Sequence, residues 1–354
     1  MALKPHQFGL VVVLAIAACS PTPTQSTPAP SATPLPAAGV SSPTPTTAPD
    51  TTPTAAPASV RVSVLADESS PVRAQVQSFA AVNGWTFVPA PASAESLREQ
   101  AQAGVEVIVI AEPGLGPAIA EVAGEHPQSY FIALQAEVAE PPGNVLALGG
   151  PGDRIDQAGF IAGLVAGHAT ETERVAVFSD TTTPTGMKYR NGFLAGVRYA
   201  CPQCQRDIID MAGSEATEFA SGEGAKVAAL GADVVFAAAG QAGEAALVAA
   251  AQNGAWVIGH RDPTAADAER VLTTITLTSE AALRSALEAY LQGRPRSGTE
   301  SLSVANGSLG LEPFSPAADL VLSPLDRQEI EATIRKLADG SLETGVDPVT
   351  GEEK

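Results

Sequence analysis

Positive charge is scarce in this chain. It has 20 lysines and arginines against 39 aspartates and glutamates, which gives a formal net charge of −19 at pH 7. Nucleic acid and anionic membrane surfaces are themselves negative and would repel such a protein. We therefore expect neither as a partner. The carboxylates are scattered along the chain, a pattern that favours solubility over recognition of a basic target.

Cysteine is also scarce, with three residues in 354. Cys201 and Cys204 form a C-P-Q-C at the expected end of a helix, where an oxidising compartment favours a local disulfide. A zinc site would need two more ligands, and none lies at a suitable spacing. A redox site stays open as an alternative, although no thioredoxin-like pattern surrounds the pair.

Long apolar runs are absent, apart from a short one near the start. Residues 8–18 are apolar and follow Lys4, but this run falls short of the about 20 residues that a spanning helix needs. The pattern is typical of a secretory signal peptide, residues 1–19. Its last four residues, I-A-A-C, resemble a lipobox and predict lipidation of Cys19. The alternative is an ordinary signal peptide with an incidental cysteine. With either, we expect an extracytoplasmic protein, anchored to the cell membrane if Cys19 is lipidated.

Residues 20–59 lack nearly everything that a folded core requires. They consist mostly of proline, threonine, serine and alanine, with Asp50 as their one charged residue and no aromatic residue. We predict a disordered tether. In a polyproline conformation it would reach on the order of 100 Å at about 3.1 Å per residue. The remaining residues are enough for two domains of ordinary size.

From residue 60 onward, β-branched apolar runs alternate with amphipathic segments, which is the pattern of an α/β fold. The first set has expected strands 60–65, 86–88, 105–110, 130–134 and 145–148, with helices 70–83, 94–103 and 117–125. It ends in the hinge-like sequence G-G-P-G, residues 149–152. The second set has helix 160–169, strand 175–178, a helix with Tyr189 near its start, strand 208–211, helix 222–230, strand 234–238, helix 244–253 and strand 256–259.

The rest of the chain does not form a third set. It contains extended segments 271–277 and 302–311 and helices 280–292 and 327–338. We expect the chain to cross back to the first unit and return to the second. This predicts an α/β fold with two doubly wound parallel-sheet lobes joined by three crossovers, a clamshell. Lobe I would comprise 60–152 and 274–309, and lobe II 153–273 and 310–354.

Candidate binding residues follow from the rule that open α/β sheets bind ligands beyond the carboxyl ends of their strands. Asp67, Gly240 and the H-R-D of residues 260–262 lie there. Arg261 and Asp262 would form an internal ion pair, or Arg261 would clamp a carboxylate or phosphate. Tyr189 is either core or a ligand-lining aromatic.

Catalytic signatures are missing. The chain has no G-x-S-x-G elbow, no H-E-x-x-H and no complete phosphate-loop motif, and it has four histidines. Of these, His260 follows a central strand. We expect no enzyme, no cofactor and no metal. An enzyme that uses His260 is the third interpretation, after two binding functions.

Several motifs in order resemble one family. D-Q-A-G-F-I-A-G-L-V-A-G at 156–167, G-M-K-Y-R-N-G-F-L-A-G-V-R-Y at 186–199 and the stretch 231–259 are similar to the basic membrane lipoprotein family. These PnrA-like proteins are nucleoside-binding substrate-binding lipoproteins of ABC transporters. The resemblance covers most of residues 60–345 and is strong from about residue 153.

The resemblance implies a type 1 periplasmic-binding fold with a purine-nucleoside-like ligand between its lobes. Tyr189 occupies the place of a base-stacking aromatic, Gly240 lies in the family's glycine loop, and Asp67 stands for part of an N-terminal ligand pattern. Arg261 replaces an aspartate that holds the ribose hydroxyls, with Asp262 beside it, so we predict altered specificity.

The function expected from the sequence is therefore that of a monomeric solute-binding lipoprotein that delivers a small ligand to an ABC permease. The alternative is a surface receptor that uses the same fold to signal through a membrane partner without delivering cargo.

Overall fold

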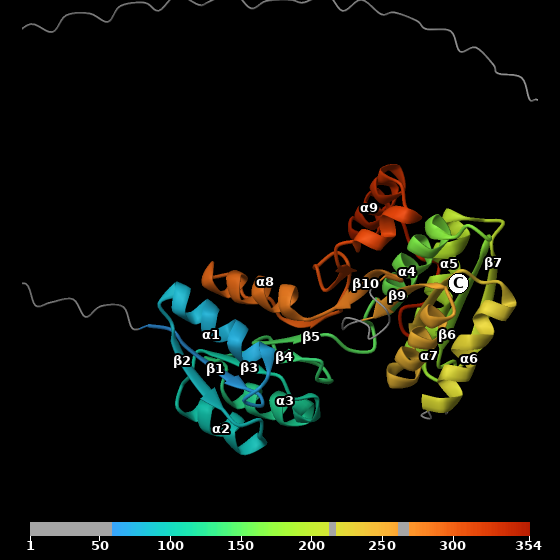
Figure 1. Ribbon diagram of the computed structural model, residues 1–354. Coiled ribbons are helices and arrows are strands. Elements are labelled where there is room, and N and C mark those ends of the chain that lie inside the picture. Colours follow the sequence, from blue (N-terminus) through green and yellow to red (C-terminus); the bar gives the residue numbers. More distant parts are fainter. Residues whose placement is uncertain (1–58, 212–216, 261–268) are drawn as a thin grey trace, which may run out of the picture. The chain divides into compact units, whose positions relative to one another are not determined.

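The computed structural model describes residues 59–211, 217–260 and 269–354, which contain two separate six-stranded sheets (Figure 1). The first sheet is entirely parallel. Its strands, in spatial order, are β2 (Thr86–Ala90), β1 (Arg61–Leu65), β3 (Val107–Ile110), β4 (Tyr130–Leu134), β5 (Val145–Leu148) and β11 (Gly298–Glu300). The second sheet, in the same sense, is β7 (Gln205–Asp210), β6 (Arg174–Ser179), β8 (Val234–Ala238), β9 (Trp256–His260), β10 (Val271–Leu277) and β12 (Leu309–Leu311).

Helices cover both faces of the first sheet, because its strands are apolar on both sides. One face packs against α1 (Pro71–Asn83) and α8 (Glu280–Leu291), which lie side by side in Figure 1. The other packs against α2 (Ala94–Gln102) and α3 (Gly116–Glu125), which follows the short 3₁₀ helix η1 (Pro113–Leu115). Along β3, Val107 and Val109 face the first pair of helices and Ile108 and Ile110 the second.

The second sheet is covered in the same way. One face packs against α4 (Ile155–Ala169), α5 (Pro184–Ala200) and α9 (Pro324–Ala338), with the 3₁₀ helix η2 (Pro316–Leu320) at its margin. The other packs against α6 (Thr217–Leu230) and α7 (Gly240–Gln252). Strand β12 runs antiparallel to β10 and forms an edge of the sheet.

The chain passes between the two sheets three times, as the sequence predicted. The first crossing lies between β5 and α4, where the chain leaves the first sheet. The second lies between β10 and α8, where it returns, and the third lies between β11 and β12, where it crosses again to the second sheet and α9. The predicted fold class is confirmed: two doubly wound, predominantly parallel lobes of the type 1 periplasmic-binding fold. The second crossing follows Leu277, which pairs with Leu309 of β12, whereas the division drawn from the sequence placed residues 274–277 with lobe I.

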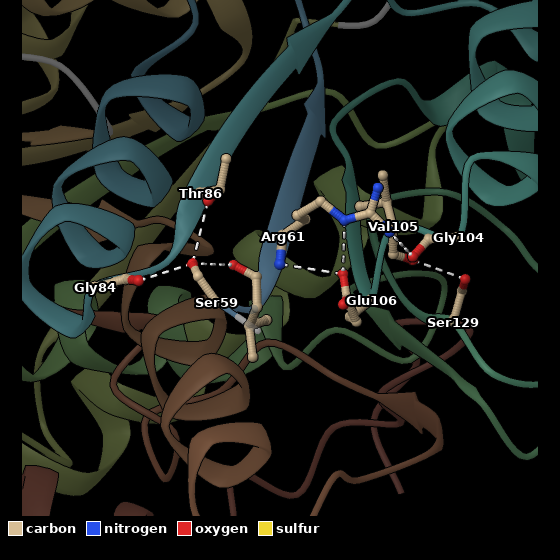
Figure 2. A network of polar contacts seen from close by, with 9 residues as sticks. Ser59, Arg61, Gly84, Thr86, Gly104, Val105, Glu106 and Ser129 are labelled. Atoms are coloured by element: carbon tan, nitrogen blue, oxygen red, sulfur yellow. Dashed lines mark hydrogen bonds and ion pairs between the residues drawn. The ribbon is translucent and has the colours of Figure 1, made fainter. Parts of the chain in front are cut away.

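The amino edge of the first sheet is held by a polar network (Figure 2). The guanidinium of Arg61 forms an ion pair with Glu106 at 3.3 Å and donates to the carbonyl oxygen of Gly104. The hydroxyl of Ser129 donates to the carbonyl oxygen of Val105 at 2.7 Å. These contacts tie the segments that lead into β1, β3 and β4.

Helices α4 and α5 approach each other so closely that their backbones touch. A β-carbon at Gly159 or Gly163 of α4 would overlap the carbonyl oxygens of Tyr189 or Phe193 on α5. The same holds in reverse for Gly192 and Gly196, which face backbone carbonyl oxygens of α4. Glycine is required at these positions for space, and not for a special backbone conformation.

The substitution Gly163→Ala tests this contact. We expect it to lower the free energy of unfolding by about 1–3 kcal/mol, because the new methyl group forces the two helices apart. The matched control is Gly124→Ala in α3, where a β-carbon meets nothing within 4 Å; there the better helix propensity of alanine should raise stability by about 0.5–1 kcal/mol. Equal effects in a denaturant titration would contradict the proposed close packing.

Tyr130 joins β4 to the segment between α8 and β11. Its hydroxyl donates to the carbonyl oxygen of Arg296 at 2.7 Å, and its ring stacks on Tyr290 with centroids 5.5 Å apart. Burial raises the pKa of Tyr130 from 10.0 to about 12, against the opposing influence of the Arg296 charge. The returning segment is thus fixed by a phenol that must stay protonated.

This pKa predicts a stability change at alkaline pH. A folded-state pKa above the ordinary value means that Tyr130 contributes stability fully below pH 10.0, and that this contribution is lost as the pH rises through about 12. Denaturant titrations between these values should show a steeper loss for the native chain than for Tyr130→Phe, which cannot ionise. Parallel curves for the two proteins would refute the assignment.

Candidate functional site

Both sheets have the strand order of a doubly wound fold, with a point at which the order of connection reverses. In the first sheet this point lies between β1 and β3, and in the second between β6 and β8. Ligands bind at the carboxyl ends of strands at such reversals. Asp67 follows β1, and Ala111 follows β3; Asp180 follows β6, and Gly240 begins the helix after β8. The two reversals therefore define the candidate site.

A cavity of about 310 Å³ opens at the carboxyl edge of the first sheet. It is lined by Ser70, Val72, Ala111, Pro113, Leu134, Gln135, Leu277, Thr278 and Ser279. These residues come from the ends of β3 and β4, from the start of α1 and from the second crossing. None of the lining side chains is charged, so hydroxyl and amide groups supply its polar side-chain contacts. Such a lining suits a neutral polar ligand.

Gln135 is the unusual residue of this cavity. It follows β4 with a φ of 55°, in the left-handed region that a residue with a side chain rarely adopts. Its N–H donates to the carbonyl oxygen of Leu148 at 2.7 Å, which fixes this conformation. Strained backbone of this kind gathers at ligand sites. The sequence analysis did not identify Gln135, and a polar residue directly after an apolar strand was the signal that could have found it.

Asp67 lies close to the cavity, as its position after β1 predicted. Its side chain is exposed, and its carbonyl oxygen accepts a hydrogen bond from the N–H of Ser70 at 3.1 Å. Ser70 itself lines the cavity. The turn from β1 into α1 therefore places Asp67 at the same sheet edge, one turn away from the lining residues.

Acidic side chains organise the loop after β6 in the second sheet. The carboxylate of Asp180 accepts from the N–H of Thr182 at 2.9 Å, and that of Asp210 accepts from the hydroxyl of Thr181 at 2.7 Å. The hydroxyl of Thr183 caps α5 by accepting from the N–H of Gly186 at 3.1 Å. Hydrogen bonds thus order this loop, residues 180–183, which lies where β6 and β8 end.

Tyr189 does not lie at the start of its helix. Helix α5 begins at Pro184, and Tyr189 points into the core with 2% of its surface exposed. Its ring meets His260 edge-on with centroids 4.7 Å apart, and its hydroxyl forms a hydrogen bond with Nε2 of His260. Phe236 packs beside it at 6.1 Å. The base-stacking role implied for Tyr189 stays a prediction, and it requires the ring to become uncovered.

Gly240 adopts a φ of 58° and begins α7. A β-carbon there would meet nothing within 4 Å, so the requirement for glycine comes from the backbone conformation. Gly240 is exposed, and the first backbone N–H groups of a helix have no partner within the helix itself. A backbone contact to a ligand at Gly240 is compatible with this geometry and stays a prediction.

The remaining predicted residues fall into two groups. Arg261, Asp262 and Cys19 lie outside the described residues. Cys201 and Cys204 form a disulfide with α-carbons 5.3 Å apart, in the short turn between α5 and β7. This bond closes the turn beyond the far end of α5, away from the loop after β6.

Within residues 59–211, 217–260 and 269–354, no three or more histidine, cysteine, aspartate or glutamate side chains come together in a way that would hold a metal ion. In the same part of the chain, no helix has both the length and the apolar character that crossing a membrane requires.

Comparison with solved structures identifies the fold. An ABC transporter solute-binding protein from Conexibacter woesei is 22% identical with a TM-score of 0.64, over 80% of this chain and 98% of that one. A transcriptional activator of the comK gene from Bacillus halodurans is 17% identical with a TM-score of 0.63, over 80% and 99%. An ABC transporter solute-binding protein from Aeropyrum pernix is 17% identical with a TM-score of 0.55, over 80% and 92%.

A search of curated proteins found no match. The family model for the PnrA-like ABC transporter substrate-binding proteins, named Bmp, matches residues 86–340. This span begins at β2 and ends just after α9, so it includes the second sheet, all three crossings and every strand of the first sheet except β1. The chain therefore belongs to the Bmp family of PnrA-like ABC transporter substrate-binding proteins.

Proposed function

We propose that this protein is the lipid-anchored, extracytoplasmic solute-binding component of an ABC importer, and that its ligand is a neutral, nucleoside-like molecule. The observation that carries the proposal is the uncharged cavity at the carboxyl edge of the first sheet, in a chain with a net charge of −19. The lining of this cavity carries no charged side chain, and the cavity lies at the strand-order reversal. A nucleoside, with several hydroxyl groups and no charge, fits this chemistry.

Closure around the ligand would follow from differential contact. A ligand that touches the first sheet's cavity and the second sheet's loops together stabilises the arrangement in which both reach it. Hinge motion of this kind needs connecting segments that absorb the change in backbone angles, and the three crossings are such segments.

The residues that we assign to the ligand come from both sheets. On the first, the amide of Gln135 would accept and donate hydrogen bonds and the carboxylate of Asp67 would accept them, since both residues lie at or beside the cavity. On the second, Gly240 would offer backbone N–H groups and Tyr189 a stacking surface. Arg261 and Asp262 follow β9 in the sequence, and their side chains would set the specificity.

Lipidation of Cys19 and a tether of residues 20–59 would keep a monomeric binding domain near its permease. The alternative of a sensing receptor gains no support from the family, whose description is that of a transporter protein. We assign the protein no catalytic role for the same reason.

The ligand class can be tested by calorimetry on the purified full chain. Purine and pyrimidine nucleosides, free bases, ribose and amino acids would be titrated separately. We expect a purine nucleoside to bind at least about 100-fold more tightly than its base or ribose alone, because both halves must contribute contacts. Tight binding of an amino acid or a sugar phosphate with no response to any nucleoside would overturn the ligand assignment.

The contribution of the Gln135 side chain to ligand binding can be separated from the cost of its left-handed backbone conformation. Gln135→Gly should raise the free energy of unfolding by up to about 1 kcal/mol, because glycine adopts positive φ without a steric cost. The same change should weaken ligand binding. The matched control is Glu140→Gly, at a φ of 47° on an exposed residue that does not line the cavity. It should gain stability with unchanged affinity. Unchanged affinity in both variants would exclude Gln135 from the site.

A further inference from the structure

Lys188 is a buried cation beside the first crossing. It lies on α5 with 3% of its surface exposed. Its ammonium donates to the carbonyl oxygen of Pro151 at 2.6 Å and lies 3.4 Å from that of Asp153. Burying a charged lysine is costly unless its hydrogen bonds are well satisfied. Here they are directed at the backbone of the segment that leaves the first sheet.

Asp153 extends this contact to the third crossing. Its carboxylate accepts a hydrogen bond from the N–H of Leu302 at 2.8 Å. The next residue, Arg154, donates its N–H to the carbonyl oxygen of Leu302 at 2.9 Å. The side-chain oxygen of Gln157 accepts from the N–H of Val304 at 3.1 Å. Two of the three crossings are therefore bonded to each other, and Lys188 holds one of them to α5.

The charges of this cluster depend on each other. Burial lowers the pKa of the Lys188 ammonium, and the negative charges of Asp153, Asp156 and Asp347 oppose this effect. Burial raises the pKa of the Asp153 carboxyl, against its backbone hydrogen bonds and the charge of Lys188. Asp156 is itself paired with Arg154 at 2.9 Å. Removal of Lys188 would thus leave Asp153 without the cation that helps to keep it ionised.

The C-terminal segment covers the same helix from another side. The backbone of Gly351, at a φ of 80°, lies so close to α5 that a β-carbon would come within 2.8 Å of the backbone nitrogen of Lys188. The side-chain amide of Asn191 donates to the carbonyl oxygen of Gly351 at 2.6 Å. The hydroxyl of Thr344 donates to Asp156. Lys188 is enclosed, and its ammonium is held against the crossing.

Helix α5 connects this cluster to the candidate site. It begins directly after the loop of residues 180–183, whose last residue caps it. Tyr189, the neighbour of Lys188, contacts His260 at the end of β9. A displacement of the loop of residues 180–183, or of the end of β9, would therefore reach Lys188 through α5.

We propose that Lys188 and Asp153 form a charged hinge clamp, which sets the open–closed equilibrium by coupling α5 to the first and third crossings. The clamp deepens the binding function proposed above and rests on it for its biological meaning. Lys188 acts as a positioning residue and touches no ligand. Motion of the loop of residues 180–183 shifts α5, and the ammonium transmits that shift to Pro151 and Asp153.

The test is hydrogen exchange on the ligand-free full chain, which does not depend on the identity of the ligand. In Lys188→Met, the amides of Leu302, Arg154 and Val304 should exchange about tenfold faster, while those of Ile132 and Val177 inside the sheets should be unchanged. Lys188→Gln, which keeps a donor without the charge, provides a second variant if the first does not fold. The matched control is Lys336→Met, since Lys336 is an exposed lysine on α9.

The pH profile distinguishes a clamp from a lysine that merely stabilises the fold. Protonation of Asp153 weakens its bond to Leu302, so the protection of Leu302 should fall as the pH falls through the raised pKa of Asp153. In Lys188→Met this fall should occur at higher pH, because the cation that opposes protonation is gone. Unchanged crossing amides, or an equal loss of protection in crossings and sheets, would overturn the clamp. A chain that binds no nucleoside but shows the local effect would refute only the ligand.

Discussion

The contact between the backbones of α4 and α5 is the constraint on which the second half of the molecule depends. Gly159 and Gly163 on one helix and Gly192 and Gly196 on the other leave no side chain between them. Interfaces packed this tightly do not deform gradually. Helix α4 follows the first crossing, and α5 follows the loop of residues 180–183. The interface between the two helices therefore joins the first crossing and this loop to one rigid body. The buried polar residues Asp156 and Lys188 lie on these two helices, Asp156 on α4 and Lys188 on α5.

The two sheets repeat one topology but bring different chemistry to their strand ends. The first offers hydroxyl and amide groups around an uncharged cavity, with Gln135 held in a strained backbone conformation. The second offers a loop ordered by Asp180 and Asp210, and the exposed start of α7 at Gly240. Parallel strands place all these groups at sheet edges of the same sense. A fold built twice can thus supply two unlike halves of one site.

Much of the fold could be predicted from the sequence because apolar β-branched runs mark buried parallel strands. Strands such as β4, Tyr130–Leu134, and β8, Val234–Ala238, have the bounds that were expected. The predictions were wrong where burial and polarity disagree. Helix α4 begins at Ile155 and not at residue 160, because its first turn contains the buried polar residues Asp156 and Gln157. Strand β7 begins at Gln205 and not at residue 208, because an exposed edge strand carries polar residues that hide its pattern.

The candidate site was less predictable than the fold. Position after a strand identified Asp67 and Gly240, because the ends of parallel strands share an edge. The spacing of Tyr189 from Phe193 predicted a core position, and its place near the start of a helix that follows a strand predicted a ligand contact. The structure buries the ring in the core, because α5 begins five residues earlier, at Pro184. The left-handed conformation of Gln135 depends on its bond to Leu148 across the sheet. No local pattern encodes a contact of that kind.

The order in which the chain visits the sheets has a consequence for how the protein is made. Leu283 and Leu287 of helix α8 cover one face of the first sheet. Between β5 and α8, however, the chain forms five strands of the second sheet, β6 to β10. During synthesis from the N-terminus, α1 can cover only part of that apolar face of β1, β3 and β4 until residues 280–291 arrive. Such exposed intermediates are prone to aggregation. The first sheet therefore completes its core late in synthesis.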